Sequence, residues 1–446
     1  MLFERLFWSA YMARHLLGQS TYPFRSLESI ERDRDRRVRA MVRYAYATVP
    51  YYRRVMDERG LRAADIRTAD DLANLPIVDR RDLQREPDSF LSTRVSPEQR
   101  LGVRSGGSSG MPITVFHDTA ALFQNAAHGE RERSIYARLV GKTVGYREAV
   151  IASPMSTARE VHRFSHSRVL SPNRVRIERQ YLSLLDPVES NVELLNAFEP
   201  DVIHSYGSYL GVLFSFVLAN QIPFHQPKVI TFSSDGISES VRRLIQDQLG
   251  IPVLGTYQAV EAFKIGFECL EHRGYHVNVD LYPLRVADRD QVMAAGGTGE
   301  LVVSNLVNRA TVLLNYRLED IAALVEEPCP CGRSLPLLSP IQGRADDWIA
   351  LPSGRVVHPQ LARSILSGTP HVWQYQILQL TATRLQVTVV ADSHCDQVQT
   401  RGLISARFAE ALGSEVQVEV MFVSSIPRTA GGKHRIVRRL ESENGQ

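Results

Sequence analysis

The chain has 446 residues, more than a single hydrophobic core usually supports, so its length predicts two or three domains. Hydrophobic residues make up 44% and charged residues 23% of the sequence, as in an ordinary soluble globular protein. The net charge of +3 is small for this length and does not favour a nucleic-acid partner, so we expect none.

Residues 1–18 are apolar, but Glu4, Arg5, Arg14 and His15 interrupt them. Because a signal peptide or a membrane span needs an unbroken apolar run, we predict no integral membrane segment here. We expect a helix packed on the body of the protein, and a helix lying at a membrane surface is the alternative.

Residues 25–95 are expected to be largely helical and polar. Five arginines crowd residues 32–39, and the apolar residues Val38, Met41, Val42, Tyr44 and Ala45 indicate a buried stripe beside this solvated face. Val-Pro-Tyr-Tyr at 49–52 marks a helix end, and Leu-Pro-Ile-Val-Asp at 75–79 marks a strand-like stop.

The segment 104–112 contains three glycines and three serines and leads into a β-branched run at 113–115. Glycine permits positive φ and close backbone approach, and serine hydroxyls donate hydrogen bonds, so the segment can wrap a polyanion. We therefore predict a phosphate-binding loop between two strands, with a flexible surface turn as the alternative. The pattern differs from the Walker motif because Met111 stands at the lysine position. The predicted phosphate-contacting residues are Ser105, Gly106, Gly107, Ser108, Ser109 and Gly110.

Between residues 145 and 255 the pattern alternates between short apolar runs and helical stretches. Such a βα rhythm is typical of a largely parallel sheet, in which ligands bind beyond the carboxyl ends of the strands. The expected strands are 149–152, 202–204, 229–232 and 251–254, and the expected helices are 209–218 and 238–249.

Tyr257 and Glu261 follow the last of these strands. A tyrosine can stack on an adenine ring, and a carboxylate can hold Mg²⁺ that bridges phosphate oxygens. Further on, a strand at 299–304 leads to Tyr-Arg-Leu-Glu-Asp at 316–320, where Asp320 can accept hydrogen bonds from both ribose hydroxyls. The alternatives are an ordinary helix start for the first pair and an ion pair on a helical turn for the second.

Cysteine and histidine form a further set, made of Cys269, His276, Cys329 and Cys331, with His272 as a reserve for His276. Thiolate and imidazole are the preferred ligands of tetrahedral zinc, and four protein ligands would make the site structural. The alternative is a buried Cys269 and two incidental cysteines. Cys329 and Cys331 are too close to pair with each other, and without a secretory signal we predict a reduced, cytoplasmic setting.

Residues 348–446 are expected to form a small α+β domain, with alternating strands at 384–390 and 416–422 around a helix at 402–412. The domain ends in Pro-Arg-Thr-Ala-Gly-Gly-Lys at 427–433. A lysine on a mobile glycine-rich loop can approach a carboxylate and an α-phosphate, whereas a solvated basic tail is the alternative.

Taken in order, these motifs resemble the phenylacetate–CoA ligase family of the adenylate-forming superfamily, and the capsule-biosynthesis branch is the most similar. The resemblance covers nearly the whole chain. It implies an α/β fold with a large core domain at 1–345, with mixed, largely parallel βα sheets and a helical N-terminal part at 1–95. A small mobile α+β lid domain would follow at 346–446.

The resemblance also implies roles for individual residues. Lys433, Glu261 and Arg344 would be catalytic, and Asp346 would be the hinge of the lid. The nucleotide would contact the loop 105–110, the turn at 233–236 on the adenine side, and the tyrosine motifs at 257–261 and 316–320. The residues implied outside the loop are Ser234, Asp235, Thr256, Tyr257, Asp320 and Arg344.

The implied activity is formation of an acyl-adenylate from ATP and a carboxylic acid with Mg²⁺, followed by acyl transfer to coenzyme A. An amine or a carrier-protein thiol is the alternative acceptor, and Tyr206, Tyr209 and Phe232 are expected to line the acid pocket. A degenerate protein that only binds nucleotide is the alternative from another class, because Met111, Gln258 and Val260 depart from the family pattern. Edge strands in a large sheet are compatible with a homodimer.

Overall fold

The computed structural model describes residues 2–104, 113–154, 156–170, 177–288, 291–292, 296–344, 349–352, 356–357, 365–366, 369–413, 416–428 and 436–439. The chain forms two compact units. The first consists of Met1–Tyr146, Pro154–Glu178 and Leu254–Pro340, and the second of Arg147–Ser153, Arg179–Val253 and Ile341–Gln446. The predicted division at residues 345/346 stays a prediction.

The first unit begins with the expected helical region. Its long helix α2 (Leu27–Thr48) starts after the N-cap Ser26, whose hydroxyl accepts a hydrogen bond from the Ser29 N–H at 3.3 Å. Val38 and Met41 are buried on one face, and the guanidinium groups of Arg32 and Arg36 are exposed, as expected for a solvated arginine face. Arg34 departs from this expectation, because its side chain is only 16% exposed and pairs with Glu31 and Asp35. Helix α1 (Leu2–Leu16) packs Trp8 against Phe123. Within the described residues no helix combines the length and the apolar character needed to cross a bilayer.

The helices of this unit are α1 (Leu2–Leu16), α2 (Leu27–Thr48), α3 (Pro50–Glu58), α4 (Arg80–Arg85), α5 (Thr119–His128), α6 (Glu130–Val140) and α7 (Thr157–Arg168). Short 3₁₀ helices lie at Tyr22–Phe24, Asp70–Asn74, Pro87–Phe90 and Pro97–Gln99.

A sheet in the first unit has the strand order β11-β10-β12-β13-β14-β9-β8-β7, and every neighbouring pair in it is antiparallel. Its strands are β7 (Val253–Ala259), β8 (Phe263–Glu268), β9 (Tyr275–Val277), β10 (Leu284–Asp288), β11 (Gln291–Val292), β12 (Thr298–Val303), β13 (Tyr316–Val325) and β14 (Leu337–Leu338). Val78 joins β13 through a parallel bridge to Tyr316, as the strand-like stop at 75–79 suggested.

A separate antiparallel hairpin in the same unit consists of β1 (Arg100–Arg104) and β2 (Thr114–Asp118). Arg104 lies opposite Thr114, so the two strands flank the predicted phosphate loop on both sides. Residues 105–112 themselves lie outside the described residues.

The second unit contains the expected βα rhythm. β3 (Arg147–Ala152), β5 (Val202–Tyr206) and β6 (Val229–Ser233) pair in parallel, and β4 (Glu178–Ser183) lies beside β3. The helices are α8 (Val188–Phe198), α9 (Gly207–Ala219) and α10 (Glu239–Arg243), which continues as a π-helical turn at Leu244–Gln248. The fourth expected strand was placed too early, because β7 begins at Val253 and runs on through Tyr257.

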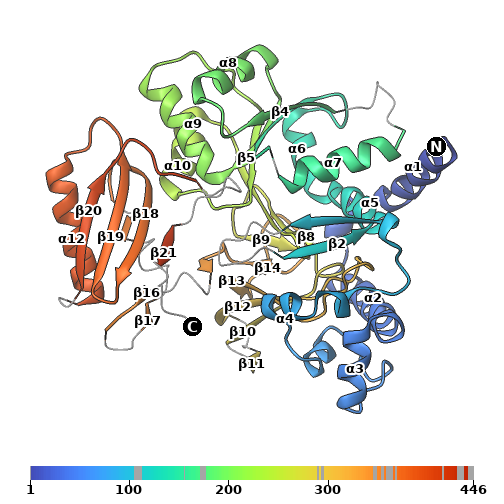
Figure 1. Cartoon of the computed structure of the whole chain (residues 1–446). Helices are drawn as coiled ribbons and strands as arrows, with labels where there is room; N and C mark the ends of the chain where they lie inside the picture. Colours follow the sequence, from blue (N-terminus) through green and yellow to red (C-terminus); the bar gives the residue numbers. More distant parts are fainter. Residues whose placement is uncertain are drawn as a thin grey trace. The chain divides into compact units, whose positions relative to one another are not determined.

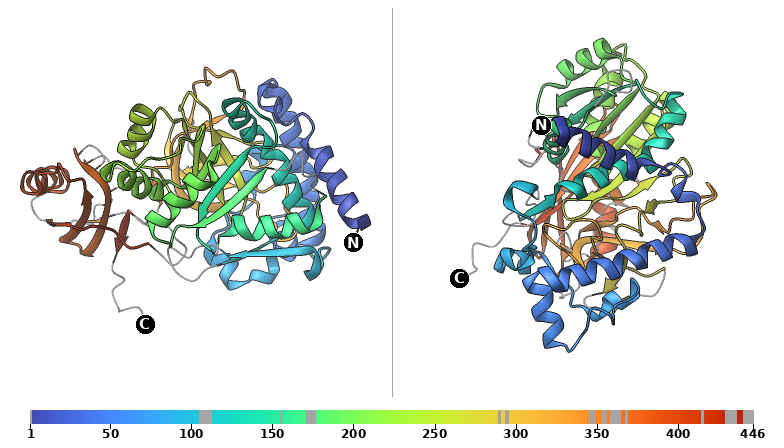
Figure 2. Two further views of the ribbon diagram at one scale, coloured as in Figure 1. Left: turned by 90° about the horizontal axis from the view of Figure 1, so that it is seen from above. Right: turned by 90° about the vertical axis from the view of Figure 1, so that its right-hand side faces the viewer.

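The C-terminal part of the second unit forms the expected small α+β fold. β18 (Val372–Thr381), β19 (Arg384–Ala391), β20 (Gln417–Phe422) and β21 (Val437–Arg439) make a sheet of order β20-β19-β18-β21. Helix α12 (Gln397–Leu412) covers one face of this sheet, and Phe408 and Ile404 are fully buried between them (Figures 1 and 2). Three two-residue strands precede it, namely β15 (Gly343–Arg344), β16 (Ile349–Ala350) and β17 (Val356–Val357). The predicted α/β class with mixed sheets and a small C-terminal α+β part is confirmed.

Candidate active site and metal centre

Two tyrosine–carboxylate hydrogen bonds join β7 and β13 in the first unit. The Tyr257 hydroxyl on β7 donates to Oδ2 of Asp320 on β13 at 2.8 Å. In the second bond the tyrosine comes from β13: the Tyr316 hydroxyl hydrogen-bonds the carboxylate of Glu261, which follows β7. Tyr257 and Asp320, which the sequence predicts to contact the nucleotide, are therefore in direct contact, and Glu261, the predicted Mg²⁺ ligand, is tied to the same strand through Tyr316.

Glu261 and Tyr316 lie in a nearly dry environment. Their exposed fractions are only 7% and 2%. Burial, followed by the negative charge of Glu261, raises the pKa of Tyr316 well above its usual range. The phenol therefore keeps its proton at neutral pH and acts as a fixed donor to the carboxylate.

Asp320 stands on a strand and not on a helical turn, so the alternative of a helical ion pair with Arg317 is wrong. Arg317 instead pairs with Glu300 on β12, with its Nε 3.1 Å from Oε2. The register of the two strands shifts between Glu300 and Val302, and Glu319 has a positive φ of 62°. Such an irregularity turns side chains away from strict alternation, and here it lies directly before Asp320.

Thr256 contacts a buried acid that the sequence did not indicate. Its hydroxyl donates to the carboxylate of Glu132 on α6, which also accepts from Lys264 Nζ at 2.7 Å and from the Tyr136 hydroxyl. Burial alone would raise the pKa of Glu132, but the charge of Lys264 and these hydrogen bonds lower it overall. Thr256 is thus held by protein, one residue before Tyr257.

In the second unit, Ser234 and Asp235 form the turn after β6. Ser234 has a positive φ of 74°, and Asp235 accepts hydrogen bonds from the Ser208 backbone N–H at 3.1 Å and its hydroxyl at 2.5 Å. The turn packs so closely on Gly207 that a Cβ there would lie 2.6 Å from the Gly236 carbonyl carbon. Only glycine fits at that position.

Arg428, part of the Pro-Arg-Thr motif, reaches the same turn. Its guanidinium donates to the Ser208 hydroxyl at 2.7 Å, lies 4.0 Å from Asp235 and stacks over the ring of Tyr209. No role for Arg428 is predicted from the sequence, since nothing in the motif indicates what it contacts. Tyr206, Tyr209 and Phe232 are buried in this unit.

Several predicted site residues cannot be placed. Ser105 to Gly110, Asp346 and Lys433 lie outside the described residues. The backbone of Arg344 belongs to β15, but its side chain is not described.

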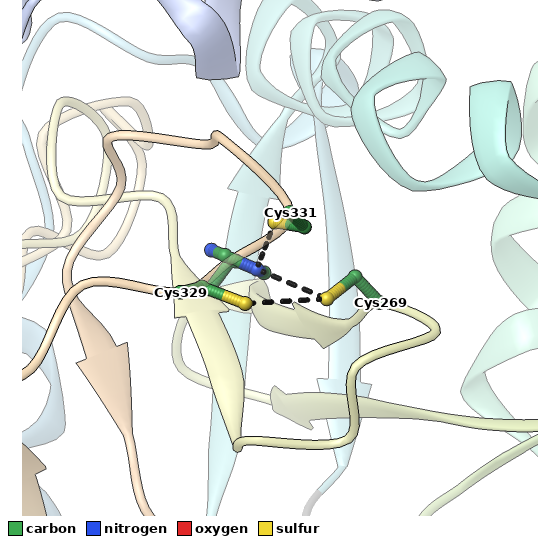
Figure 3. Close-up of side chains that lie close together, drawn as sticks. Cys269, Cys329 and Cys331 are labelled. Carbon is green, nitrogen blue, oxygen red and sulfur yellow. Dashed lines mark hydrogen bonds between the residues drawn. The ribbon is translucent and has the colours of Figure 1, made fainter.

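The four predicted zinc ligands come together in the first unit. The ligand atoms of Cys269, His276, Cys329 and Cys331 all lie within 4.8 Å of one another (Figure 3). His276 Nε2 is 3.4 Å from the sulfur of Cys269 and 3.3 Å from that of Cys331, and the sulfurs of Cys269 and Cys329 are 3.6 Å apart. His276 rather than His272 is the imidazole of the set, as predicted.

Local structure explains how these residues meet. Cys269 directly follows β8 and His276 lies on β9, so the β8–β9 hairpin carries both. Cys329 and Cys331 come from the loop before β14, where Gly332 has a φ of 79° that allows the tight turn.

The chemistry of this cluster suits a metal. Burial and the charge of Arg333 lower the pKa of His276 to about 4, so the imidazole is neutral at pH 7 and has a free lone pair. Without a metal, burial raises the pKa of Cys269 to about 12. For Cys331, burial is outweighed by hydrogen bonds from Arg333, which lower its thiol pKa. Three thiol sulfurs and a neutral imidazole match a tetrahedral zinc site.

Comparison with known proteins supports the motif-based resemblance. A model of the CapK C-terminal domain matches residues 349–439. The phenylacetate-coenzyme A ligase of Thermus thermophilus is 25% identical over 434 residues, which cover 95% of this chain and 92% of that protein. Protein CapK of Staphylococcus aureus is 21% identical over 391 residues, which make up 86% of this chain and 84% of that protein.

Solved structures show the same fold. A 2-hydroxyisobutyryl-CoA ligase in the postadenylation state, with a bound adenylate, matches with a TM-score of 0.73 at 18% identity and covers 93% of this chain and 90% of its own. The amide bond synthetase McbA from Marinactinospora thermotolerans matches with a TM-score of 0.53 at 15% identity over 75% of this chain and 68% of that one.

Proposed function

We propose that this chain, a relative of the phenylacetate–CoA ligases and CapK over most of its length, is an AMP-forming ligase. It activates a carboxylic acid with ATP and passes the acyl group to a thiol, coenzyme A by preference. The observation that carries this proposal is the pair of tyrosine–carboxylate bonds that join Tyr257 to Asp320 and Glu261 to Tyr316, within a chain related to such ligases.

The proposed reaction has two steps. In the first, a carboxylate oxygen attacks the α-phosphorus of ATP, the bond from that phosphorus to the pyrophosphate oxygen breaks, and acyl-AMP and pyrophosphate form. In the second, the thiol sulfur attacks the acyl carbon, the bond from that carbon to the AMP oxygen breaks, and the thiol proton passes to solvent. AMP and a thioester are the products.

The residues of the first unit supply contacts for the nucleotide. Asp320 accepts hydrogen bonds from the ribose hydroxyls, and the Tyr257 hydroxyl keeps the Asp320 carboxylate in place. Glu261 is a buried oxygen donor of the kind that Mg²⁺ prefers, fixed from one side by Tyr316. A bound Mg²⁺ would supply charge neutralisation for the leaving pyrophosphate.

The remaining roles rest on the sequence motifs. Ser105 to Gly110 cradle the phosphates, Lys433 stabilises the charge that moves during transfer, and Arg344 reaches phosphate or ribose. Ser234 and Asp235 border the adenine. The lid domain at 346–446 turns about Asp346 after adenylation, and the CapK C-terminal domain match at 349–439 supports this boundary.

The Cys269, His276, Cys329 and Cys331 cluster would hold a structural zinc ion. Four protein ligands leave no open coordination position for a reactive water, so the ion would join the β8–β9 hairpin to the loop before β14. It would contribute to stability and not to the chemical step.

Pyrophosphate exchange tests the proposed function. The protein is incubated with ATP, Mg²⁺ and labelled pyrophosphate, with a panel of aryl and aliphatic carboxylic acids that includes phenylacetate. Acid-dependent return of label into ATP is expected for at least one acid. If none of the acids supports exchange, but calorimetry shows that ATP binds, the protein would instead be a nucleotide-binding protein without this activity.

An amine is the second candidate acceptor, since the fold is shared with the amide bond synthetase McbA. Once an acid is known, coenzyme A, a phosphopantetheinylated carrier protein and simple amines can be compared as acceptors by mass spectrometry. Thioester formation with coenzyme A is the expected result.

Tyr257→Phe is expected to raise the KM for ATP about three- to tenfold with little change in kcat, because Asp320 loses one hydrogen bond and becomes less ordered. Steady-state adenylation kinetics measure this. Tyr46→Phe is the matched control, since it removes a Tyr–Asp hydrogen bond to Asp57 at 2.9 Å on the exposed surface. Equal KM values for the wild type and Tyr257→Phe would contradict the prediction.

A further inference from the structure

The main chain at Glu261 is held from two sides by buried side chains of other segments. His117 on β2 lies with Nε2 2.8 Å from the carbonyl oxygen of Val260. The side-chain amide of Asn305 donates to the carbonyl oxygen of Glu261 at 2.9 Å. His117 is 0% and Asn305 is 2% exposed, so neither bond competes with bulk water.

The imidazole of His117 can only be the donor in its bond. A carbonyl oxygen accepts, so the proton is on Nε2, and burial lowers the pKa of His117 to about 4, which keeps the ring neutral. The ring packs on Phe263 with centroids 4.1 Å apart. The donor therefore has a fixed direction.

Asn305 is equally fixed. Its Oδ1 accepts from the backbone N–H groups of Val307 at 2.9 Å and Asn308 at 3.0 Å. Because Oδ1 is used in this way, the NH₂ group must face Glu261.

The segment that carries Asn305 is itself tied to β2. The side-chain amide of Asn308 donates to the carbonyl oxygen of Phe116 at 2.8 Å. The Oδ1 atom of Asn308 accepts from the Asp118 N–H at 3.1 Å. β2 follows the predicted phosphate loop, so one buried network supports both that strand and the turn at Glu261.

We propose that Asn305, supported by His117, is a positioning residue that fixes the main chain at Glu261 so that its carboxylate stays at the Tyr316 hydroxyl. Asn305 touches no substrate and acts through Glu261. Its effect on catalysis rests on the proposed function, in which Glu261 holds Mg²⁺, whereas its effect on the position of Glu261 does not.

Asn305→Asp tests the proposal with little change in shape. The variant keeps an oxygen for the N–H groups of Val307 and Asn308, but it turns a carboxylate oxygen toward the Glu261 carbonyl in place of the donor. The Mg²⁺ concentration for half-maximal pyrophosphate exchange is expected to rise about tenfold. Asn191→Asp is the matched control, because it also removes a fully buried amide donor, which bonds the Ser183 carbonyl oxygen at 2.9 Å in the second unit and not Glu261.

A merely structural role predicts that both variants lose stability and that neither moves the Mg²⁺ dependence. The proposal predicts a comparable loss of thermal stability in both and a shift of the Mg²⁺ dependence in Asn305→Asp alone. Equal Mg²⁺ dependence in the wild type and Asn305→Asp would overturn it, as would an equal shift in both variants.

A second pair keeps the test open if Asn305→Asp does not fold. His117→Gln retains a donor near the Nε2 position and should behave like the wild type, whereas His117→Leu removes it and should raise the Mg²⁺ requirement. An equal response of the two variants would count against the proposal.

Crystal structures give a readout without activity. In Asn305→Asp, or in His117→Leu, the Glu261 carboxylate should have moved away from the Tyr316 hydroxyl. An unmoved turn would overturn the inference even in an active enzyme. If the wild type shows no exchange with any acid, the proposed function fails, and this structural comparison still decides the inference.

Discussion

Cys329→Ser is expected to abolish binding of one zinc ion per chain and to lower the thermal unfolding midpoint by about 10 °C. Cys329 contributes one of four ligand atoms that lie within 4.8 Å of one another, and a hydroxyl is a poor replacement for a thiolate. The proposed ion would link the β8–β9 hairpin to a loop about 60 residues further on, so its loss would free both. Elemental analysis of purified protein and thermal scans with and without a chelator measure the two effects.

Cys395→Ser provides the matched control, because Cys395 lies outside the cluster with its sulfur 3.3 Å from the Thr400 hydroxyl. It should retain the full metal content and unfold near the wild-type temperature. Substoichiometric metal in the wild type, combined with an unchanged midpoint for Cys329→Ser, would remove the zinc proposal.

Glu261→Gln is expected to slow adenylation about 10²–10³-fold, comparable to the loss of one preorganised group that stabilises transition-state charge. Glutamine keeps an oxygen that can accept from Tyr316, so the turn should stay in place while the negative charge at the proposed Mg²⁺ site is lost. Rates of pyrophosphate exchange at saturating ATP measure the effect. Glu326→Gln makes the same change at an exposed position and should be neutral.

Lys433→Ala in the same assay tests the proposed role of the C-terminal lysine in stabilising the charge that moves during transfer. Loss of exchange with retained ATP binding is expected, because the lysine is proposed to act on the transferring group and not to anchor the nucleotide. Wild-type rates in both Glu261→Gln and Lys433→Ala would remove the proposed mechanism.

Much of the fold follows from local sequence pattern. The sequence predicts the strands β3, β5 and β6 and the helices α9 and α10, because buried parallel strands are short apolar runs and these two helices have clear periodicity, whereas it does not predict β4 and α8. The C-terminal strands β19 and β20 alternate strictly, and they were predicted for the same reason. The cluster of three cysteines and a histidine could be predicted because thiol ligands have few other common arrangements.

Other parts could not be predicted because they depend on long-range contacts. The spacing of Arg317 and Asp320 also fits a helical turn, and only the pairing of β12 with β13 makes it a strand. Glu132 and Asn305 belong to no motif, and the motif that contains Arg428 does not indicate what it contacts. Each gains its role from a partner more than 40 residues away, namely Thr256, Glu261 and Ser208.

The spacing of the sulfurs in the metal cluster has a practical consequence for handling the protein. Cys269 and Cys329 have their sulfurs 3.6 Å apart, and a small movement would bring them to the bonding distance of about 2 Å. In a chelated sample left in air, these two thiols should therefore form a disulfide, which Ellman titration detects as a loss of two thiols per chain. The oxidised protein should then not bind added zinc. Reconstitution should succeed only after treatment with a reductant, and a preparation that ignores this would report a falsely low metal content.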